Sequence, residues 1–294
     1  MSLKQPTIIA IGEVLWDLFP DGPQFGGAPA NFACQAARLS GLSDGPQASV
    51  VMASAVGNDE RGQKARRVLA DNNVDVECVE TIDGRPTGSV GVELDDQGRP
   101  RFTIHDQVAW DHLNWTDTLA ARLSTADAVY FGTLGQRSEQ SRSVIRQALR
   151  AAERAIRLLD VNLRSPFYDA ALIRESIEQA TVLKLSDEEL AEVGRACGVV
   201  ATSPSQMLAQ LRERFELDLV VMTRGADGAI AVTAEQTVEQ SAVRVAVVDT
   251  VGAGDAFAAA VLSGKLQQTD CADILRQACQ FAAEVCTHSG AVPR

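Results

Sequence analysis

Two glycines and an acid stand close together near the C-terminus, in the stretch Gly252-Ala253-Gly254-Asp255. Glycines allow the backbone to come close to a ligand, and the small apolar residues that follow predict a helix beginning at Asp255. The first N–H groups of a helix have no partners within it, and the helix dipole favours negative charge there, so this stretch could bind a phosphate. The carboxylate of Asp255 could accept a proton beside it. A capped loop explains the stretch alone equally well. A dinucleotide-binding fingerprint explains it poorly, because Phe257 occupies its third glycine position.

A second group of such residues lies near the N-terminus. Asp17 interrupts an otherwise apolar stretch at 14–19, and it is either a turn residue or a residue that faces a ligand. The sequence Gly26-Gly27-Ala28-Pro29-Ala30-Asn31 then predicts a tight turn, and the apolar spacing at 30–39 predicts a helix after it. Both glycine-rich turns therefore lead into a predicted helix.

The composition excludes several classes of protein. The chain has 294 residues, 46% of them hydrophobic, which suffices for one large core. The net charge of -12 argues against nucleic-acid binding, no apolar run is long enough for a membrane span, and we expect no secretory signal. None of the six cysteines forms a Cys-x-x-Cys pair and the three histidines lack metal-ligand spacing, so we expect free thiols, no structural zinc and a cytoplasmic protein.

Strand and helix patterns alternate along most of the chain. Strands are expected at 8–11, 48–56, 74–79, 127–131, 157–163, 182–185 and 217–222, and an apolar run at 243–248 predicts another that ends at the glycine turn. Helices are expected at 30–39, 61–72, 139–156, 168–179, 187–197, 207–215, 255–266 and 271–288. This alternation predicts right-handed crossovers and an α/β fold in which helices cover both faces of a mostly parallel sheet.

Ligands of such folds gather at the carboxyl ends of the strands. The residues expected there are Asp160, Asn162, Arg164, Lys184, Ser186, Thr223, Arg224, Gly225 and Asp249. The segments 87–94 and 101–105 follow another pattern, since apolar residues alternate with small or polar ones on both sides of a turn at 95–99. We expect residues 87–105, with part of residues 13–28, to form a small β lid over the site, within a single domain of residues 1–294.

No Walker A motif, Gly-x-Ser-x-Gly elbow, His-Glu-x-x-His motif or protein-kinase signature is present. Four segments instead resemble signatures of the ribokinase (PfkB) family of carbohydrate kinases, in the order that the family has them. They are Gly26-Gly27-Ala28-Pro29-Ala30-Asn31, Val56-Gly57-Asn58-Asp59 with Gly62, Thr223-Arg224-Gly225-Ala226-Asp227-Gly228, and Asp249-Thr250-Val251-Gly252-Ala253-Gly254-Asp255. The resemblance runs from Gly12 to about Gly290. It implies a three-layer α/β/α ribokinase-like fold that uses ATP and Mg²⁺ to phosphorylate a sugar or nucleoside hydroxyl.

The resemblance also implies a role for each candidate residue on the substrate side. Asp255 resembles the base that takes the hydroxyl proton, and an acid at a helix N-terminus should be ionised and ready to accept it at neutral pH. The backbone N–H groups that resemble the anion hole belong to Gly252, Ala253 and Gly254. The positions that match sugar-binding residues are Asp17, Gly27, Asn31 and Asn162. Arg164 would screen the charge of the transferred phosphoryl group, with a structural ion pair to Asp160 or Asp169 as the alternative.

Other residues resemble the family's nucleotide and metal positions. Glu189 matches the acid of a motif linked to Mg²⁺ through water, although Ser186 stands where the family has Asn, and Ser186 with Glu189 also fits a helix capping box. The residues assigned to the nucleotide are Lys184, Ser186, Thr223, Gly225, Gly228 and His288, the last within a segment that resembles the adenine loop. A monovalent cation such as K⁺ would bind at Asp249, Val251 and Gly290.

The form of the first signature, and the segment Ala109-Trp110-Asp111-His112, look most like those of bacterial-type fructokinases. The expected reaction is therefore the conversion of D-fructose to fructose 6-phosphate. 2-Keto-3-deoxygluconate kinases share the Asp-x-Asn-x-Arg motif at 160–164 and are the nearest alternative, with ribokinase after them. A sugar- or nucleotide-binding sensor on the same fold is the non-enzyme alternative. We expect a small-molecule sugar as the partner, no nucleic acid or membrane, and a homodimer formed through the β lid.

Overall fold

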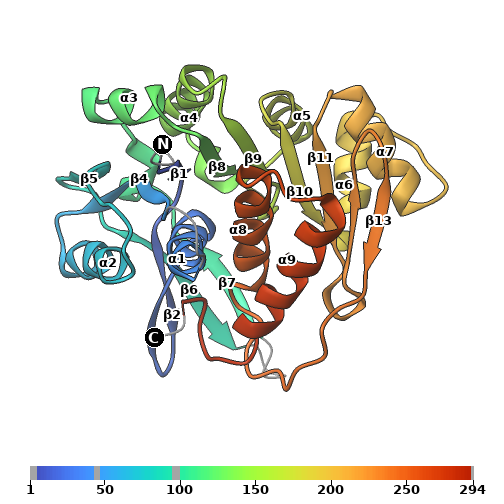
Figure 1. Ribbon diagram of the computed structural model, residues 1–294. Helices are drawn as coiled ribbons and strands as arrows, with labels where there is room; N and C mark the ends of the chain where they lie inside the picture. Colours follow the sequence, from blue (N-terminus) through green and yellow to red (C-terminus); the bar gives the residue numbers. More distant parts are fainter. Residues whose placement is uncertain (1–4, 43–46, 95–99, 293–294) are drawn as a thin grey trace.

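The computed structural model describes residues 5–42, 47–94 and 100–292, and two sheets organise them (Figure 1). The main sheet has the strand order β13-β12-β11-β10-β9-β8-β1-β4-β5. Its strands are β1 (Thr7–Ile11), β4 (Ser49–Gly57), β5 (Val79–Ile82), β8 (Ala128–Gly132), β9 (Ile156–Asp160), β10 (Val182–Ser186), β11 (Leu219–Thr223), β12 (Ala229–Val232) and β13 (Thr237–Gln240). Neighbouring strands are parallel from β5 to β11, and β12 pairs antiparallel with both of its neighbours.

Alternate residues of the strands belong to two separate cores, one on each face of this sheet. In β1, Ile8 and Ala10 pack into one core, whereas Ile9 and Ile11 pack into the other. Because successive side chains of a strand point to opposite faces, a strand buried on both sides has a continuous apolar sequence. The prediction of a mostly parallel sheet covered on both faces is confirmed.

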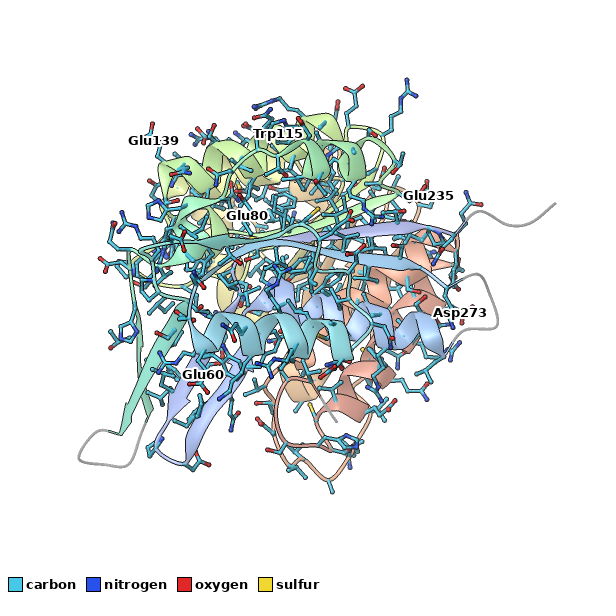
Figure 2. The ribbon with its side chains drawn as sticks, turned by 90° about the vertical axis from the view of Figure 1, so that its left-hand side faces the viewer. Glu60, Glu80, Trp115, Glu139, Glu235 and Asp273 are labelled. Atoms are coloured by element: carbon cyan, nitrogen blue, oxygen red, sulfur yellow. The ribbon has the colours of Figure 1, made fainter. Side chains whose placement is uncertain are left out.

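Two layers of helices bury these faces. One layer contains α1 (Ala28–Gly41), α2 (Glu60–Asp71), α8 (Ala253–Leu266) and α9 (Cys271–Val285). The other contains α3 (Asp117–Ser124), α4 (Glu139–Ala151), α5 (Ala170–Glu178), α6 (Asp187–Cys197) and α7 (Pro204–Arg214). Figure 2 shows the main sheet between them, with Trp115 and Glu139 on one side and Glu60 and Asp273 on the other.

The second sheet is small and has the order β3-β2-β6-β7. Its strands are β2 (Leu15–Phe19), β3 (Gly22–Gly26), β6 (Gly88–Leu94) and β7 (Pro100–Ile104). The expected turn at 95–99 lies outside the described residues, while β6 and β7 pair antiparallel on either side of it. The carboxylate of Asp59 ties this sheet to the main body, since it caps α2 through Gly62 N and also accepts from Thr87 N and Oγ1 just before β6.

Some expected elements differ from those observed. The run at 243–248 forms no strand, and Val247 and Val248 are exposed there. Alternating valines satisfy the sequence pattern of a strand, but this segment has no paired strand, and Val248 N donates instead to Cys286 O at 2.9 Å. The expected strand at 74–79 contributes a single bridge at Asp75, and the strand proper is β5. The helix expected at 139–156 ends at Ala151.

The cysteines are free thiols, as predicted, and five of the six are buried. Within the described ranges, no helix combines the length and the apolar character needed to cross a membrane.

Candidate active site

The glycine turn forms the N-terminus of α8, although no strand precedes it. Gly252 caps the helix in the left-handed conformation with φ 80°, and a Cβ atom there would lie 2.6 Å from Ala291 Cα, so both backbone and packing require glycine. Ala253 N donates to Thr250 O at 3.2 Å. Among the described residues, no hydrogen-bond acceptor is found for the N–H groups of Gly252 and Gly254. These two groups and the helix dipole can therefore receive an anion.

Asp255 lies in the first turn of α8 and is only 8% exposed. Asn31, in the first turn of α1, donates from Nδ2 to Asp255 Oδ2 at 2.9 Å. Burial and the nearby charge of Asp160 raise the pKa of Asp255 to about 7, and the Asn31 hydrogen bond opposes the rise. The sequence predicted an ionised Asp255, but burial raises its pKa so far that the acid is only partly ionised at neutral pH. A pKa near 7 suits a general base at neutral pH.

A buried ion pair lies beside this acid. Lys184 Nζ is 2.9 Å from both carboxylate oxygens of Asp160, and Tyr130 donates to Asp160 Oδ2 at 3.2 Å. Burial raises the pKa of Asp160, although Lys184 opposes the rise. A Cβ atom on Gly254 would lie 3.1 Å from Lys184 Nζ, so the ammonium group lies against the first turn of α8. Asp160 pairs with Lys184, and no ion pair of Arg164 with Asp160 or Asp169 is found among the described residues.

Arg164 and Asp17 approach the site from two different sheets. Arg164 is exposed after β9, and the hydrogen bond found for its guanidinium is to the neighbouring Leu163 O. Burial raises the pKa of Asp17, on β2, and the charge of Arg164 opposes that rise as it does for Asp255. Asp17 Oδ2 would lie 2.7 Å from a Cβ atom on Gly26, so the carboxylate faces the first glycine turn beside Gly27. The charge of Arg164 therefore acts both on Asp17, in the second sheet, and on Asp255, at the start of α8.

The segment after β9 is held in place by Glu189. Its Oε1 accepts from Leu163 N at 2.6 Å, and its Oε2 accepts from Ser186 N at 2.8 Å. The second bond is the Glu189 half of the predicted capping box of α6. Asn162, next to Leu163, has the left-handed φ of 41° that asparagine tolerates better than most residues. Glu189 thus links the start of α6 to the turn that carries Asn162.

The residues predicted for the nucleotide lie further along the strand ends and at the C-terminus. Ser186 on β10 is the register partner of Thr223 on β11. A Cβ atom on Gly228 would lie 1.9 Å from Gln240 O, so close packing of β13 requires this glycine. His288, by contrast, is exposed after α9.

The loop before α8 and the C-terminal segment lie side by side (Figure 1). Asp249 joins them, since its Oδ2 accepts from Gly290 N at 2.9 Å and its Oδ1 from Val251 N at 3.0 Å. The predicted cation residues are therefore neighbours. Val247, Val248 and Val251 expose apolar surface on the same loop.

Comparisons with known proteins identify the family of this chain. The sequence profile of the pfkB family of carbohydrate kinases matches residues 22–293. The chain belongs to this family. A fructokinase of Klebsiella pneumoniae is 33% identical over 269 residues, which are 87% of this chain and 83% of that protein.

Solved structures of related kinases have the same fold. A fructokinase from Vibrio cholerae O395, with fructose, ADP and a calcium ion bound, has a TM-score of 0.81 at 26% identity, covering 98% of this chain and 95% of that one. An aminoimidazole riboside kinase from Salmonella enterica, bound to aminoimidazole riboside and an ATP analogue, has a TM-score of 0.79 at 26% identity, covering 97% and 95%. The ribokinase-like fold and the activity class of carbohydrate kinase are therefore confirmed.

No group of three or more His, Cys, Asp or Glu side chains that could hold a metal ion is found within residues 5–42, 47–94 and 100–292. Mg²⁺ in phosphoryl-transfer enzymes usually keeps several waters and binds through one or two carboxylates and the substrate phosphates. Glu189, whose oxygens already accept backbone N–H groups, fits a ligand that acts through water.

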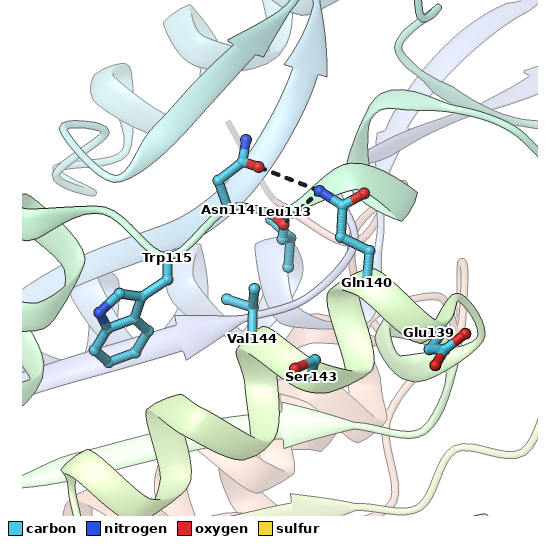
Figure 3. A pocket seen from close by; sticks show the side chains of 7 residues that line it. All are labelled: Leu113, Asn114, Trp115, Glu139, Gln140, Ser143 and Val144. Carbon is cyan, nitrogen blue, oxygen red and sulfur yellow. Dashed lines mark hydrogen bonds between the residues drawn. The ribbon is translucent and has the colours of Figure 1, made fainter.

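One pocket of the kinase lies outside this site. It has a volume of about 570 Å³ between the start of α4 and the segment at 113–115, and none of the predicted site residues lines it (Figure 3). Within it, Gln140 Nε2 donates to Leu113 O at 3.1 Å and to Asn114 Oδ1 at 3.2 Å.

Sequence reasoning gave no role to Glu13, which the structure places in the same region of the kinase. It follows β1, is 3% exposed, and is coupled electrostatically to Arg164. The sequence pattern that could have indicated Glu13 is an acid two residues after an apolar strand, at the strand end where ligands of α/β folds bind.

Proposed function

We propose that this kinase transfers the γ-phosphate of ATP to D-fructose and forms fructose 6-phosphate. The observation that carries the proposal is the buried Asp255, held by Asn31 beside the two unpartnered N–H groups of Gly252 and Gly254. The fructokinase of Klebsiella pneumoniae at 33% identity supports fructose as the acceptor.

In the proposed reaction, Asp255 takes the proton of the fructose 6-hydroxyl while the hydroxyl oxygen attacks the γ-phosphorus, and ADP leaves. Proton removal by a positioned acid of this kind contributes about 10²–10⁴-fold to the rate. The N–H groups of Gly252 and Gly254 form the anion hole, which stabilises charge on the transferred group. The N–H group of Ala253 between them donates to Thr250 O. Arg164 is free to screen the same charge, because it forms no ion pair within the described part of the chain. Phosphoryl transfer needs little beyond such positioning and charge stabilisation.

The sugar would bind between the two sheets, at Asp17, Gly27, Asn31 and Asn162. Carboxylate and amide oxygens accept hydrogen bonds from hydroxyl groups, and the amide of Asn31 retains a buried, unpartnered Oδ1. The second sheet, from residues 15–26 and 88–104, would act as a lid that closes over the sugar, and its edge strands would pair two copies into a dimer.

The nucleotide would bind along the carboxyl ends of β10 and β11. Its binding residues would be Lys184, Ser186, Thr223, Gly225, Gly228 and His288. The adenine ring would pack on the exposed valines of the loop before α8. Bound Mg²⁺ would neutralise phosphate charge, with Glu189 as its ligand through water, and K⁺ would bind at Asp249, Val251 and Gly290.

The sugar is tested with purified enzyme by coupled measurement of ADP release, comparing kcat/KM for fructose, 2-keto-3-deoxygluconate and ribose. We expect the highest value for fructose. A higher value for either other sugar replaces fructose with that sugar. Sugar binding by calorimetry without turnover of any sugar would instead support a sensor and overturn the kinase assignment for this chain.

A further inference from the structure

Glu13 is a buried acid for which the proposed reaction has no use. The backbone groups of Glu13 and Ala28 act to lower the pKa of its carboxyl group, so both lie close to it, and Ala28 is the first residue of α1. Its Oε2 is buried and has no hydrogen-bond partner among the described residues. A buried acceptor left without a partner costs free energy, so its persistence at this position needs an explanation.

The position of Glu13 is the topological switch point of the main sheet. From β1 the chain continues to β4 on one side, while β8 lies on the other side of β1. Glu13 follows β1, and a Cβ atom on Gly135, which follows β8, would lie 3.4 Å from Glu13 Oε2. Ligands of open α/β sheets bind in the crevice outside such a point.

Ion pairing with a neighbour does not satisfy this carboxyl group. Arg137 lies close enough to lower its pKa, but burial dominates and raises that pKa to about 7. The guanidinium of Arg137 contacts Asp111 at 2.7 and 2.8 Å through Nε and Nη2, and His105 O at 2.6 Å through Nη2. Its Nη1 is buried and bonds neither Glu13 nor any other described residue. No ion pair to Glu13 is found within the described residues.

The unpartnered oxygen has a counterpart in the proposed sugar site. Asn31 lies one turn along α1 from Ala28, and its Oδ1 is also buried without a partner while its Nδ2 holds Asp255. Both acceptors, Glu13 Oε2 and Asn31 Oδ1, lie beside the start of α1, and a ligand that donates hydrogen bonds would satisfy them. A polyol such as a sugar supplies several hydroxyl donors at once.

We propose that Glu13 accepts a hydrogen bond from a sugar hydroxyl other than the one that is phosphorylated, and that it thereby selects which sugars the kinase accepts. The inference rests on the proposed function, because fructose serves as the probe. A site built to bind a hydroxyl discriminates against sugars that lack it, since its own buried group is then left unpaired.

The test combines Glu13→Gln with fructose analogues that each lack one hydroxyl: the 1-, 3- and 4-deoxy sugars and 2,5-anhydromannitol. We expect Glu13→Gln to lower kcat/KM for fructose by roughly 10- to 100-fold, the value of a hydrogen bond to a charged group, mainly through the KM for the sugar. For the one analogue that lacks the contacted hydroxyl, wild type and variant should agree within about threefold. The KM for ATP should stay unchanged.

Glu80→Gln is the matched control. Glu80 binds Asn114 N and Nδ2 on the far layer, so this variant should keep wild-type kinetics with every sugar. If Glu13→Gln fails to fold, as judged by circular dichroism, Glu13→Asp replaces it, because the carboxylate remains but is shorter by one methylene. The same loss on fructose and on all analogues, or no loss at all, overturns the proposal.

Failure of the proposed function gives a different result. In that case the wild type prefers another sugar of the panel, and deoxy analogues of that sugar then test Glu13 in the same way.

Discussion

The half of the site proposed for the sugar and the half proposed for the nucleotide differ in how the protein surrounds them. Around the sugar, Asp255, Asn31 and Glu13 are buried, and two of their oxygens lack partners. Around the nucleotide, Lys184 and Gly228 are buried, but Gly225 and His288 are exposed, and the loop before α8 presents apolar side chains to solvent.

The difference indicates two modes of recognition. Buried acceptors without partners bind strongly to matching donors and reject ligands that lack them. Exposed apolar surface and backbone groups give contacts that are individually weak. Substitutions in the sugar half should therefore change kcat or specificity strongly, and those in the nucleotide half should change the KM for ATP slightly.

The largest effect is expected for Asp255→Asn. The variant keeps the hydrogen bond from Asn31 but cannot accept the hydroxyl proton, so kcat should fall about 10²–10⁴-fold with sugar binding retained. Single-turnover kinetics and calorimetry measure the two quantities. Unchanged turnover would exclude Asp255 as the base.

The same substitution should stabilise the fold at alkaline pH. Because the pKa of Asp255 is about 7 in the folded protein and about 4 in an unfolded chain, the stability contributed by its protonated form is fully present below pH 4 and lost as the pH rises through 7. Asparagine has no charge to desolvate. The free energy of unfolding at pH 8 should therefore rise by a few kcal/mol at most, with little change at pH 4.

Lys184→Met tests the buried charge next to this acid. Removing Lys184 leaves Asp160 buried without its cation, so the free energy of unfolding should fall by about 3–5 kcal/mol. The exposed pair of Arg276 and Asp273 supplies the control, since Arg276→Met should cost at most about 1 kcal/mol. Denaturant unfolding at pH 8 measures both, and equal losses would contradict the burial argument. Adding Asp160→Asn to Lys184→Met should recover much of the stability.

The value of kcat/KM should depend on pH through the buried acids of the sugar half. Ionised Asp255 is the reactive form, so kcat/KM for fructose should fall about tenfold per pH unit below pH 7 and level off above it. Glu13, whose pKa is also about 7, titrates in the same range. The acid limb should persist in Glu13→Gln if Asp255 causes it. A profile that is flat between pH 5 and 8 would show that substrate binding or release hides the proton transfer.

The sequence predicted the parts of the site that depend on local chemistry. The glycine turn before Asp255 and the capping box of Ser186 and Glu189 are set by residues three positions apart or fewer, so their patterns are visible in the chain. The burial of a charge is not local. Asp160 and Arg164 both belong to the polar residues expected at the carboxyl end of a strand, yet Asp160, the last residue of β9, is fully buried against Lys184 and Arg164 is exposed.

The wrong strand at 243–248 has a related cause. Alternating valines describe one face of a strand, but a strand also needs a neighbour to satisfy its N–H and C=O groups. The neighbour is a property of the fold. The contact between Asn31 and Asp255 spans 224 positions, and only the resemblance to a family indicated that both belong to one site.

The smallest effect is expected in the nucleotide half, from Val248→Ser. Val248 is 64% exposed, so the fold should lose little stability, whereas adenine packed on this loop should lose part of its apolar contact. Losing part of a valine contact costs about 1 kcal/mol, which raises the KM for ATP roughly fivefold and leaves kcat and the KM for fructose unchanged. Val200→Ser is the control, because Val200 is 87% exposed after α6 and should leave all three constants unchanged. A change in the KM for fructose in Val248→Ser would mean that the two halves are coupled and would contradict the separation between them.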